Sequence, residues 1–287
     1  MEKNILKRVA SLALALVMVL SVLVVVDPKE VSAAAERNMK GSGTQTIQIT
    51  DADIYNMAVA NGEYYDDLYV KFKPSKTGYV TFKMALSSTE YPYSVGTVAL
   101  CNSKKTPLSK DDVYNTNGTD SRFYTVTYGV EKGKQYYLKV YTEVGTKIKA
   151  TFKSQSKSKA NSRGKAKNLA KNKEAKGIMI ANSSKADWYK IKLTKKQKLK
   201  VTMGAQTNAS GEYDGIKFSF YDGKGKLWTS ESIEYFSRGY KESKWTQTYQ
   251  MKDRRTGKTY PISKGTYYVK VERANRTSSG YYTLKWK

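Results

Sequence analysis

The sequence predicts an all-β protein built from two antiparallel β-sandwich domains. Short runs in which Tyr, Thr and Val alternate with Lys recur along the chain, which contains 24 Tyr and only 5 Pro. Such alternation is typical of strands with one buried and one solvent-exposed face. The same series of strand patterns occurs twice in the same order. Beyond the N-terminal segment, no stretch longer than a turn or two shows a helical period.

The first 35 residues have the pattern of a secretory signal peptide. Three basic residues precede an apolar stretch from Val9 to Val26, and a run of small residues, 32–35, follows. A basic region, an apolar region and an A-x-A-like site are the parts of such a peptide. The apolar stretch also reaches the length of a membrane span, so an uncleaved anchor is the alternative. In both cases the rest of the chain is expected outside the cytoplasm, either secreted or associated with the cell envelope.

Composition divides the remaining chain. A polar leader rich in Gly and Ser is predicted to be disordered. A later segment carries eight Lys or Arg against the single acid Glu174, and it is predicted to be a flexible linker whose later part can form the first edge of domain two. The predicted units are the signal peptide (1–35), the leader (36–45), domain one (46–153), the linker (154–176) and domain two (177–287).

The two domains agree in the phase of their strands as well as in their order. Side chains alternate between the two faces of a strand, so equivalent strands of a duplicated domain bury equivalent positions. Aligning Asp66 with Asp187 keeps five inward faces in register. The matched inward residues are Leu68, Val70 and Phe72 with Tyr189, Ile191 and Leu193; Val80 and Phe82 with Val201 and Met203; Val98 and Leu100 with Phe218 and Phe220; Tyr136, Leu138 and Val140 with Tyr267, Val269 and Val271; and Ile148, Ala150 and Phe152 with Tyr282, Leu284 and Trp286.

Four motifs in domain two occur in an order that is typical of one known family. They are an opening strand at 187–193 (DWYKIKL), a hairpin at 218–225 (FSFYDGKG), a strand at 265–271 (GTYYVKV) and a closing strand at 279–284 (SGYYTL). With these motifs, domain two resembles the bacterial pre-peptidase C-terminal domain. Domain one resembles it less closely, because Asn102 stands where the hairpin Asp is expected.

The resemblance implies a jelly-roll-like β-sandwich of the kind found on secreted bacterial proteins, often beside a peptidase. Relatives in collagenases bind the substrate matrix, and some bind calcium. These 287 residues contain no peptidase domain, so the resemblance does not imply a role tied to proteolysis.

The chain has no His and a single Cys, Cys101, which lies in an apolar run and is expected to be buried. Without His, neither a Ser–His–Asp nor a Cys–His arrangement can form, and no His-based zinc site exists. Neighbouring acids such as Asp51 and Asp53 could act on glycosides, but acids on turns are usually solvated or capping. We therefore predict a protein that is not an enzyme and has no catalytic residues or metal ligands.

We predict no cofactor, with one alternative that rests on two oxygen-rich clusters, at 51–53 and 115–120. They offer the ligands that calcium prefers, although neither follows the twelve-residue loop spacing. A structural calcium ion is that alternative.

An insertion in domain two is rich in aromatic residues within a polar background. Rings on a sandwich can form a platform for the faces of sugars or for a peptide, whereas the alternative is that about half of them fill the core. The predicted ligand-binding residues are Trp228, Tyr235, Tyr240, Trp245 and Tyr249.

The net charge of +26 favours anionic partners. We predict a non-catalytic secreted or cell-surface binding protein for a cell-wall polymer, a polysaccharide or an extracellular matrix protein, with envelope association through the basic linker. No motif for specific nucleic-acid recognition is present. The alternative function is an accessory or inhibitory partner of a separately encoded secreted hydrolase or peptidase.

Overall fold

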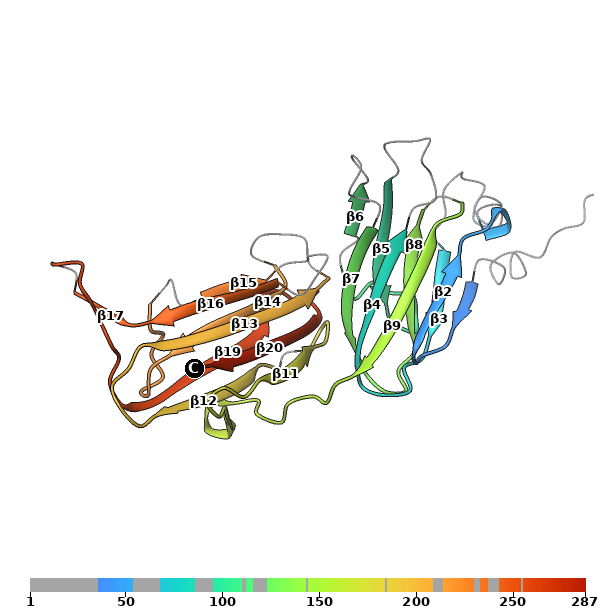
Figure 1. Cartoon of the computed structure of the whole chain (residues 1–287). Coiled ribbons are helices and arrows are strands. Elements are labelled where there is room, and N and C mark those ends of the chain that lie inside the picture. The colour runs from blue at the N-terminus through green and yellow to red at the C-terminus, as the bar shows by residue number, and fades with distance from the viewer. Residues whose placement is uncertain are drawn as a thin grey trace, which may run out of the picture.

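The chain folds into two jelly-roll-like β-sandwiches, as predicted (Figure 1). In the computed structural model, the elements in the described ranges are strands apart from short turns such as the 3-10 turn η1 (Arg163–Lys165). The predicted signal peptide lies outside these ranges, and within them no helix is long and apolar enough to cross a membrane. The described ranges are 36–53, 68–85, 95–109, 112–115, 123–142, 144–183, 185–208, 214–229, 233–236, 243–253 and 255–287.

Domain one, residues 36–154, consists of a five-stranded sheet packed on a four-stranded sheet. The five-stranded sheet has the order β1 (Glu36–Met39), β3 (Leu68–Phe72), β8 (Tyr136–Tyr141), β5 (Val95–Cys101) and β6 (Asp112–Asn115). The four-stranded sheet has the order β2 (Thr44–Gln48), β9 (Lys147–Ser154), β4 (Gly78–Ala85) and β7 (Phe123–Val130).

Domain two, residues 158–287, repeats this arrangement strand for strand. Its five-stranded sheet has the order β10 (Lys167–Asn168), β12 (Asp187–Leu193), β19 (Gly265–Arg273), β14 (Ile216–Tyr221) and β15 (Ile233–Phe236). Its four-stranded sheet has the order β11 (Ala175–Met179), β20 (Gly280–Trp286), β13 (Leu199–Thr207) and β16 (Ser243–Tyr249). An added hairpin of β17 (Met251–Lys252) and β18 (Thr259–Tyr260) extends away from the sandwich (Figure 1).

The predicted inward positions form the two cores. The predicted inward residues are buried, as in Leu68, Val70 and Phe72 of β3 and in Tyr189, Ile191 and Leu193 of β12, except Phe152, which is partly buried and packs against the core of domain one. Cys101 is also fully buried, as expected. Burial of apolar area stabilises the fold by about 25 cal/mol per Å². A shift of one residue in the pairing of a strand would expose its apolar side chains, and the inward positions therefore specify the register of the strands.

The hairpin that follows β14 has the same geometry as the one that follows β5. Asp222 accepts a backbone bond from Lys226 with its side chain, and Asn102 accepts one from Thr106. The left-handed position is filled by Gly225 (φ +85°) in domain two and by Lys105 (φ +59°) in domain one. The Asn that departs from the family motif therefore takes the same capping role as the Asp.

The predicted disordered leader differs from the structure. Strand β1 begins at Glu36 and pairs in parallel with β3, and Met39 is only 7% exposed. Short edge strands of this kind are held by backbone hydrogen bonds, which leave little mark on the pattern of side chains.

The predicted flexible linker differs from the structure in its earlier part, which packs on domain two, whereas its later part forms an edge of that domain, as expected. Strand β10 pairs in parallel with β12 at the position that β1 occupies in domain one. Ala160 and Leu169 are each 4% exposed, and the backbone N–H of Trp188 donates to the carbonyl of Ala160 (2.7 Å). Ala160 and Leu169 are thus buried against domain two. They hold the rest of the segment, which is mainly Lys, Ser and Asn, on that domain.

The edge strand β7 of domain one contacts the end of the four-stranded sheet of domain two, so the two sandwiches touch directly (Figure 1). The backbone N–H of Gly129 donates to Ser279 Oγ (2.8 Å), which in turn donates to the carbonyl of Met179 (3.0 Å). The rings of Tyr79 and Tyr281 stack beside them at a centroid distance of 4.3 Å.

Replacing Gly129 with Ala is expected to separate the domains. A Cβ at this position would lie 2.3 Å from the carbonyl oxygen of Met179, a backbone atom that cannot rotate away. We expect small-angle scattering to show a larger radius of gyration for Gly129→Ala than for the wild type. Gly164→Ala is the control, because a Cβ there meets nothing within 4 Å. Identical scattering from both variants would contradict the interface.

Candidate ligand-binding face

Two of the five aromatic residues predicted to bind a ligand lie against the core of domain two. Tyr249 is 3% exposed, and its ring stacks on Phe220 at a centroid distance of 3.8 Å. Trp228 is half-buried and packs edge-on against Phe220 (5.9 Å) and Tyr267 (5.8 Å). These two rings therefore stabilise the sandwich, which was the alternative interpretation of the insertion.

The other predicted rings do not form one surface with them. Trp245 is 53% exposed at the beginning of the edge strand β16, where its indole N–H donates to the side chain of Gln247 (3.3 Å). Tyr235 is half-buried on β15, and Tyr240 lies outside the described residues. Trp245 is thus the one strongly exposed ring among the four predicted residues that the structure describes.

A different set of rings lies on the outer face of the five-stranded sheet of domain two. Trp188 on β12 and Tyr221 on β14 approach each other across the intervening strand β19, with ring centroids 5.3 Å apart. Tyr268 on β19 is paired with Tyr221 in the sheet. All three side chains are partly exposed, because they occupy the outward positions of strands whose inward residues fill the core.

Cations accompany these rings. The Lys270 ammonium lies 5.8 Å from the centroid of the Trp188 ring, and the Arg163 guanidinium lies 5.8 Å from that of Tyr268. Lys270 is also ion-paired with Glu272 (2.6 Å). We call the set of Trp188, Tyr221, Tyr268, Lys270 and Arg163 the ring face. Its rings offer flat apolar surfaces, and its cations attract negative charge.

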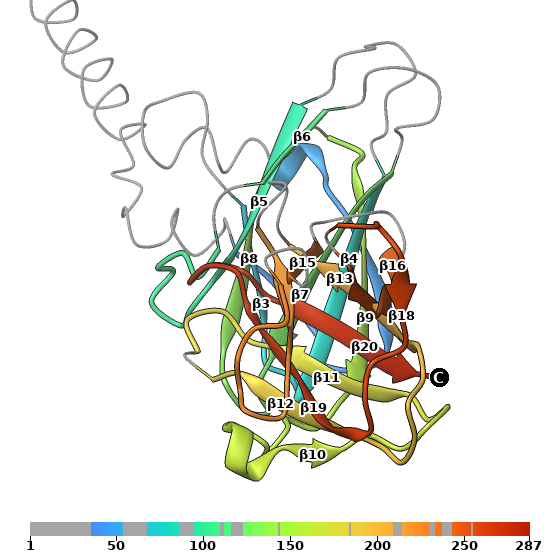
Figure 2. The ribbon, with the colours of Figure 1, turned by 90° about the vertical axis from the view of Figure 1, so that its left-hand side faces the viewer.

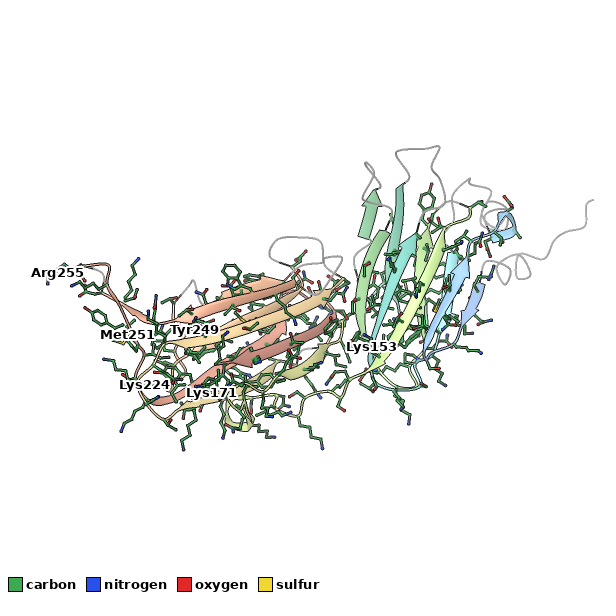
Figure 3. All side chains as sticks on the ribbon, viewed as in Figure 1. Lys153, Lys171, Lys224, Tyr249, Met251 and Arg255 are labelled. Atoms are coloured by element: carbon green, nitrogen blue, oxygen red, sulfur yellow. The ribbon has the colours of Figure 1, made fainter. Side chains whose placement is uncertain are left out.

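Arg163 is positioned by the turn that follows β14. Its Nη1 donates to the carbonyl of Lys224 (2.7 Å), which fixes η1 against this turn. A Cβ on Gly225 would collide with the same nitrogen, so the glycine serves both the left-handed turn and the approach of the arginine. In Figure 3, Lys224 and Lys171 project from the same side of domain two.

Domain one has a smaller counterpart of the ring face. The rings of Tyr69 and Tyr137 meet edge to face at a centroid distance of 6.0 Å, and the Lys105 ammonium lies 4.6 Å from the centroid of Tyr69. Tyr137 is only 5% exposed, since its neighbours cover it. The larger accessible aromatic surface therefore belongs to domain two.

Among the residues that the structure describes, the carboxylate with the most strongly raised pKa is buried beneath the ring face. Tyr282 donates a hydrogen bond to Asp187, and the hydroxyl of Tyr189 bonds to that of Tyr282 (2.8 Å). Burial raises the pKa of Asp187 to about 6, although hydrogen bonds from Tyr282 and Ser158 act to lower it. Burial also raises the pKa of Tyr189 to about 12. This network joins the two sheets of the sandwich and the segment before β10.

In the first of the two oxygen-rich clusters, the carboxylate oxygens of Asp53 accept hydrogen bonds from other residues of the protein. Both carboxylate oxygens of Asp53 accept bonds from Arg37 (2.9 Å), and one also accepts from the backbone N–H of Thr50 (2.8 Å). Burial alone would raise the pKa of Asp53, but the bonds from Thr50 and Arg37 lower it overall. Among the residues that the structure describes, no group of three or more Cys, Asp or Glu is arranged to hold a metal. Residues 116–120 of the second cluster lie outside them.

No protein-family model and no curated protein matches this chain. Among solved structures, it is similar to the pre-peptidase C-terminal domain of a collagenase from Bacillus anthracis, with 11% identity, a TM-score of 0.27, and 47% of this chain and 100% of that chain covered. It is also similar to the CBM22-1–CBM22-2 tandem domain of Xyn10C from Paenibacillus barcinonensis, with 11% identity, a TM-score of 0.23, and 74% and 79% covered. The family that the motifs of domain two resemble therefore recurs among the structures.

The ring face could have been found from the sequence by following outward positions instead of inward ones. Trp188 and Lys190 alternate with the buried residues of β12, and Tyr268 and Lys270 do the same on β19. What the alternation does not reveal is the strand order, which places β19 between β12 and β14.

Proposed function

We propose that this protein is a non-catalytic binding protein that holds a polysaccharide on the ring face of domain two. The observation that carries the proposal is the pair of adjacent rings, Trp188 and Tyr221, with Lys270 and Arg163 beside them. Aromatic rings make extensive dispersion contacts with the C–H groups on the faces of sugar rings. The nearby cations favour a polysaccharide that carries negative groups.

Two features of the sequence support this proposal. The absence of His removes the commonest general base and the usual nucleophile–base arrangements. The signal-peptide pattern of residues 1–35 supports export, which would bring the protein to cell-wall or extracellular polymers. The proposed location is therefore outside the cell or at its surface.

Replacing Trp188 with Ala is expected to weaken polysaccharide binding by about five- to thirtyfold, since a stacked ring contributes roughly 1–2 kcal/mol. The measurement is a screen of cell-wall fractions and glycans followed by calorimetry with the best ligand. Trp245→Ala is the matched control, because it removes an exposed Trp from a different sheet. A loss of binding in Trp245→Ala but not in Trp188→Ala would move the site to the originally predicted insertion and refute the ring face.

A second candidate function, partnership with a separate secreted hydrolase or peptidase, is favoured by the β17–β18 hairpin. Met251 and Tyr260 lie opposite each other there and are 48% and 41% exposed. Figure 3 shows Arg255 at the far tip of this extension and Met251 nearer to the sandwich. Stable binding of a hydrolase that depends on Met251 and Tyr260, with no binding of glycans, would favour this function over the first.

A further inference from the structure

A groove of about 620 Å³ lies between the basic segment, residues 155–169, and the body of domain two. Five lysines line it, together with the hydroxyl-bearing residues Ser156, Ser158 and Tyr189. None of its lining residues is an acid. The lysines are Lys157, Lys159, Lys165, Lys167 and Lys176. A groove lined by ammonium and hydroxyl groups without a carboxylate is suited to an anion.

Three of these lysines have no carboxylate partner within the described parts of the chain. Lys157 is ion-paired with Glu131 of domain one, and Lys176 lies 3.4 Å from Glu174. No ion pair is present for the others, which are Lys159, Lys165 and Lys167. The groove therefore keeps an excess of positive charge, even though the neighbouring carboxyl of Asp187 accepts a hydrogen bond from Ser158 in its lining.

The groove is held in shape by the backbone of the basic segment. The backbone N–H of Ala160 donates to Ser158 Oγ (3.1 Å), and that of Leu169 donates to the carbonyl of Lys190 on β12 (2.9 Å). Figure 2 shows η1 and β10 beside β12 at one edge of the domain. An ordered groove avoids part of the entropic cost that a flexible polycation would meet on binding.

The groove is joined to the ring face by η1. Lys165 lines the groove, whereas Arg163, two residues earlier, reaches the ring of Tyr268 and the carbonyl of Lys224. A ligand that crosses η1 can therefore contact both the rings and the lysines.

We propose that the groove binds phosphate groups of the polysaccharide that lies on the ring face. Lysine ammonium groups act as separate point charges and can approach a tetrahedral oxyanion from several directions, whereas a planar carboxylate is better matched by the fork of an arginine. This inference rests on the proposed function for the sugar part of the ligand. The anion site itself rests on the geometry of the groove.

The test compares the variant Lys159→Gln/Lys165→Gln/Lys167→Gln with a control, Lys195→Gln/Lys196→Gln/Lys198→Gln. Both remove three exposed lysines and the same charge, and the control residues belong to the turn between β12 and β13. The ligands are inorganic phosphate, a phosphorylated polysaccharide and the same polysaccharide after removal of its phosphate. Inorganic phosphate is expected to shift the amide resonances of residues 155–160 and 165–167, and the groove variant is expected to lose at least tenfold in affinity for the phosphorylated polysaccharide while the control keeps it.

The outcomes separate this inference from the proposed function. If the dephosphorylated polysaccharide binds the wild type as tightly as the phosphorylated one, and Trp188→Ala weakens both, the phosphate site is refuted and the ring face stands. If phosphate binds in the groove but Trp188→Ala has no effect on any glycan, the proposed function fails and the anion site stands. Equal losses in the groove variant and the control, or equal binding of double-stranded DNA, would show a nonspecific polycation and overturn the inference.

Discussion

Replacing Phe220 with Ala is expected to destabilise domain two by about 3–5 kcal/mol, the usual cost of deleting a buried phenyl ring. Phe220 is fully buried and stacks between Tyr249 (3.8 Å) and Tyr267 (5.7 Å), with Trp228 against its edge. The ring therefore ties the four-stranded sheet, through Tyr249 of β16, to the five-stranded sheet. Its loss leaves a cavity that these neighbours cannot close without breaking their own contacts.

Denaturant unfolding followed by tryptophan fluorescence measures this effect selectively, because all four Trp of the chain lie in domain two. The control is Leu100→Ala, the matched position of domain one, which is also fully buried. It should destabilise domain one and shift the tryptophan transition much less. A loss of less than about 1 kcal/mol in Phe220→Ala would contradict the stacking described for this core.

Replacing Asp187 with Asn is expected to stabilise domain two at neutral pH and to have little effect near pH 4. Burial raises the pKa of Asp187 from 3.8 to about 6 in the folded protein. The folded state thus holds a proton that the unfolded state releases, so stability falls as pH rises through the window between 3.8 and 6. The full penalty above that window is about 3 kcal/mol. An Asn keeps an acceptor for Tyr282 and removes the buried charge.

The measurement is the free energy of unfolding of wild type and Asp187→Asn between pH 4 and pH 8. The expected difference grows with pH and levels off above about pH 7. Asp53→Asn should instead destabilise the protein by a nearly constant amount over this range, because hydrogen bonds from Thr50 and Arg37 lower the pKa of Asp53 below 3.8 and the carboxylate stays ionised here. A constant difference across this range for Asp187→Asn would show that the carboxyl does not titrate there.

The inward faces of the strands could be predicted from the sequence because the hydrophobic effect acts on side chains, and side chains are what a sequence shows. Tyr282 and Ile148 occupy the same place in the two repeats, and both are fully buried. The edge strand β1 could not be predicted in this way, and β10 was expected only as an edge somewhere in the later part of the linker. Their pairing depends on backbone groups, and Lys167 and Asn168 carry no apolar signal.

The candidate binding residues could be predicted from the sequence only in part, and for a different reason. Trp245 and Tyr249 lie four residues apart on β16 and therefore on the same face of that strand. Burial rises along the strand, however, because Tyr249 lies over Phe220 whereas Trp245 lies at the open end of the edge strand. The ring face depends on the order of three strands that are distant in sequence, and alternation within a single strand does not encode that order.

The most direct test of the ring face is to follow the four indole N–H resonances of the full chain during titration with the polysaccharide selected by the binding screen. The indole of Trp188 is expected to shift with ligand concentration, since it lies on the ring face. Trp286 should not shift, because it is 6% exposed and its N–H donates to the carbonyl of Leu169 (2.6 Å). Trp245 should not shift either, since it belongs to the other sheet. A shift of Trp245 with Trp188 unchanged would contradict the account.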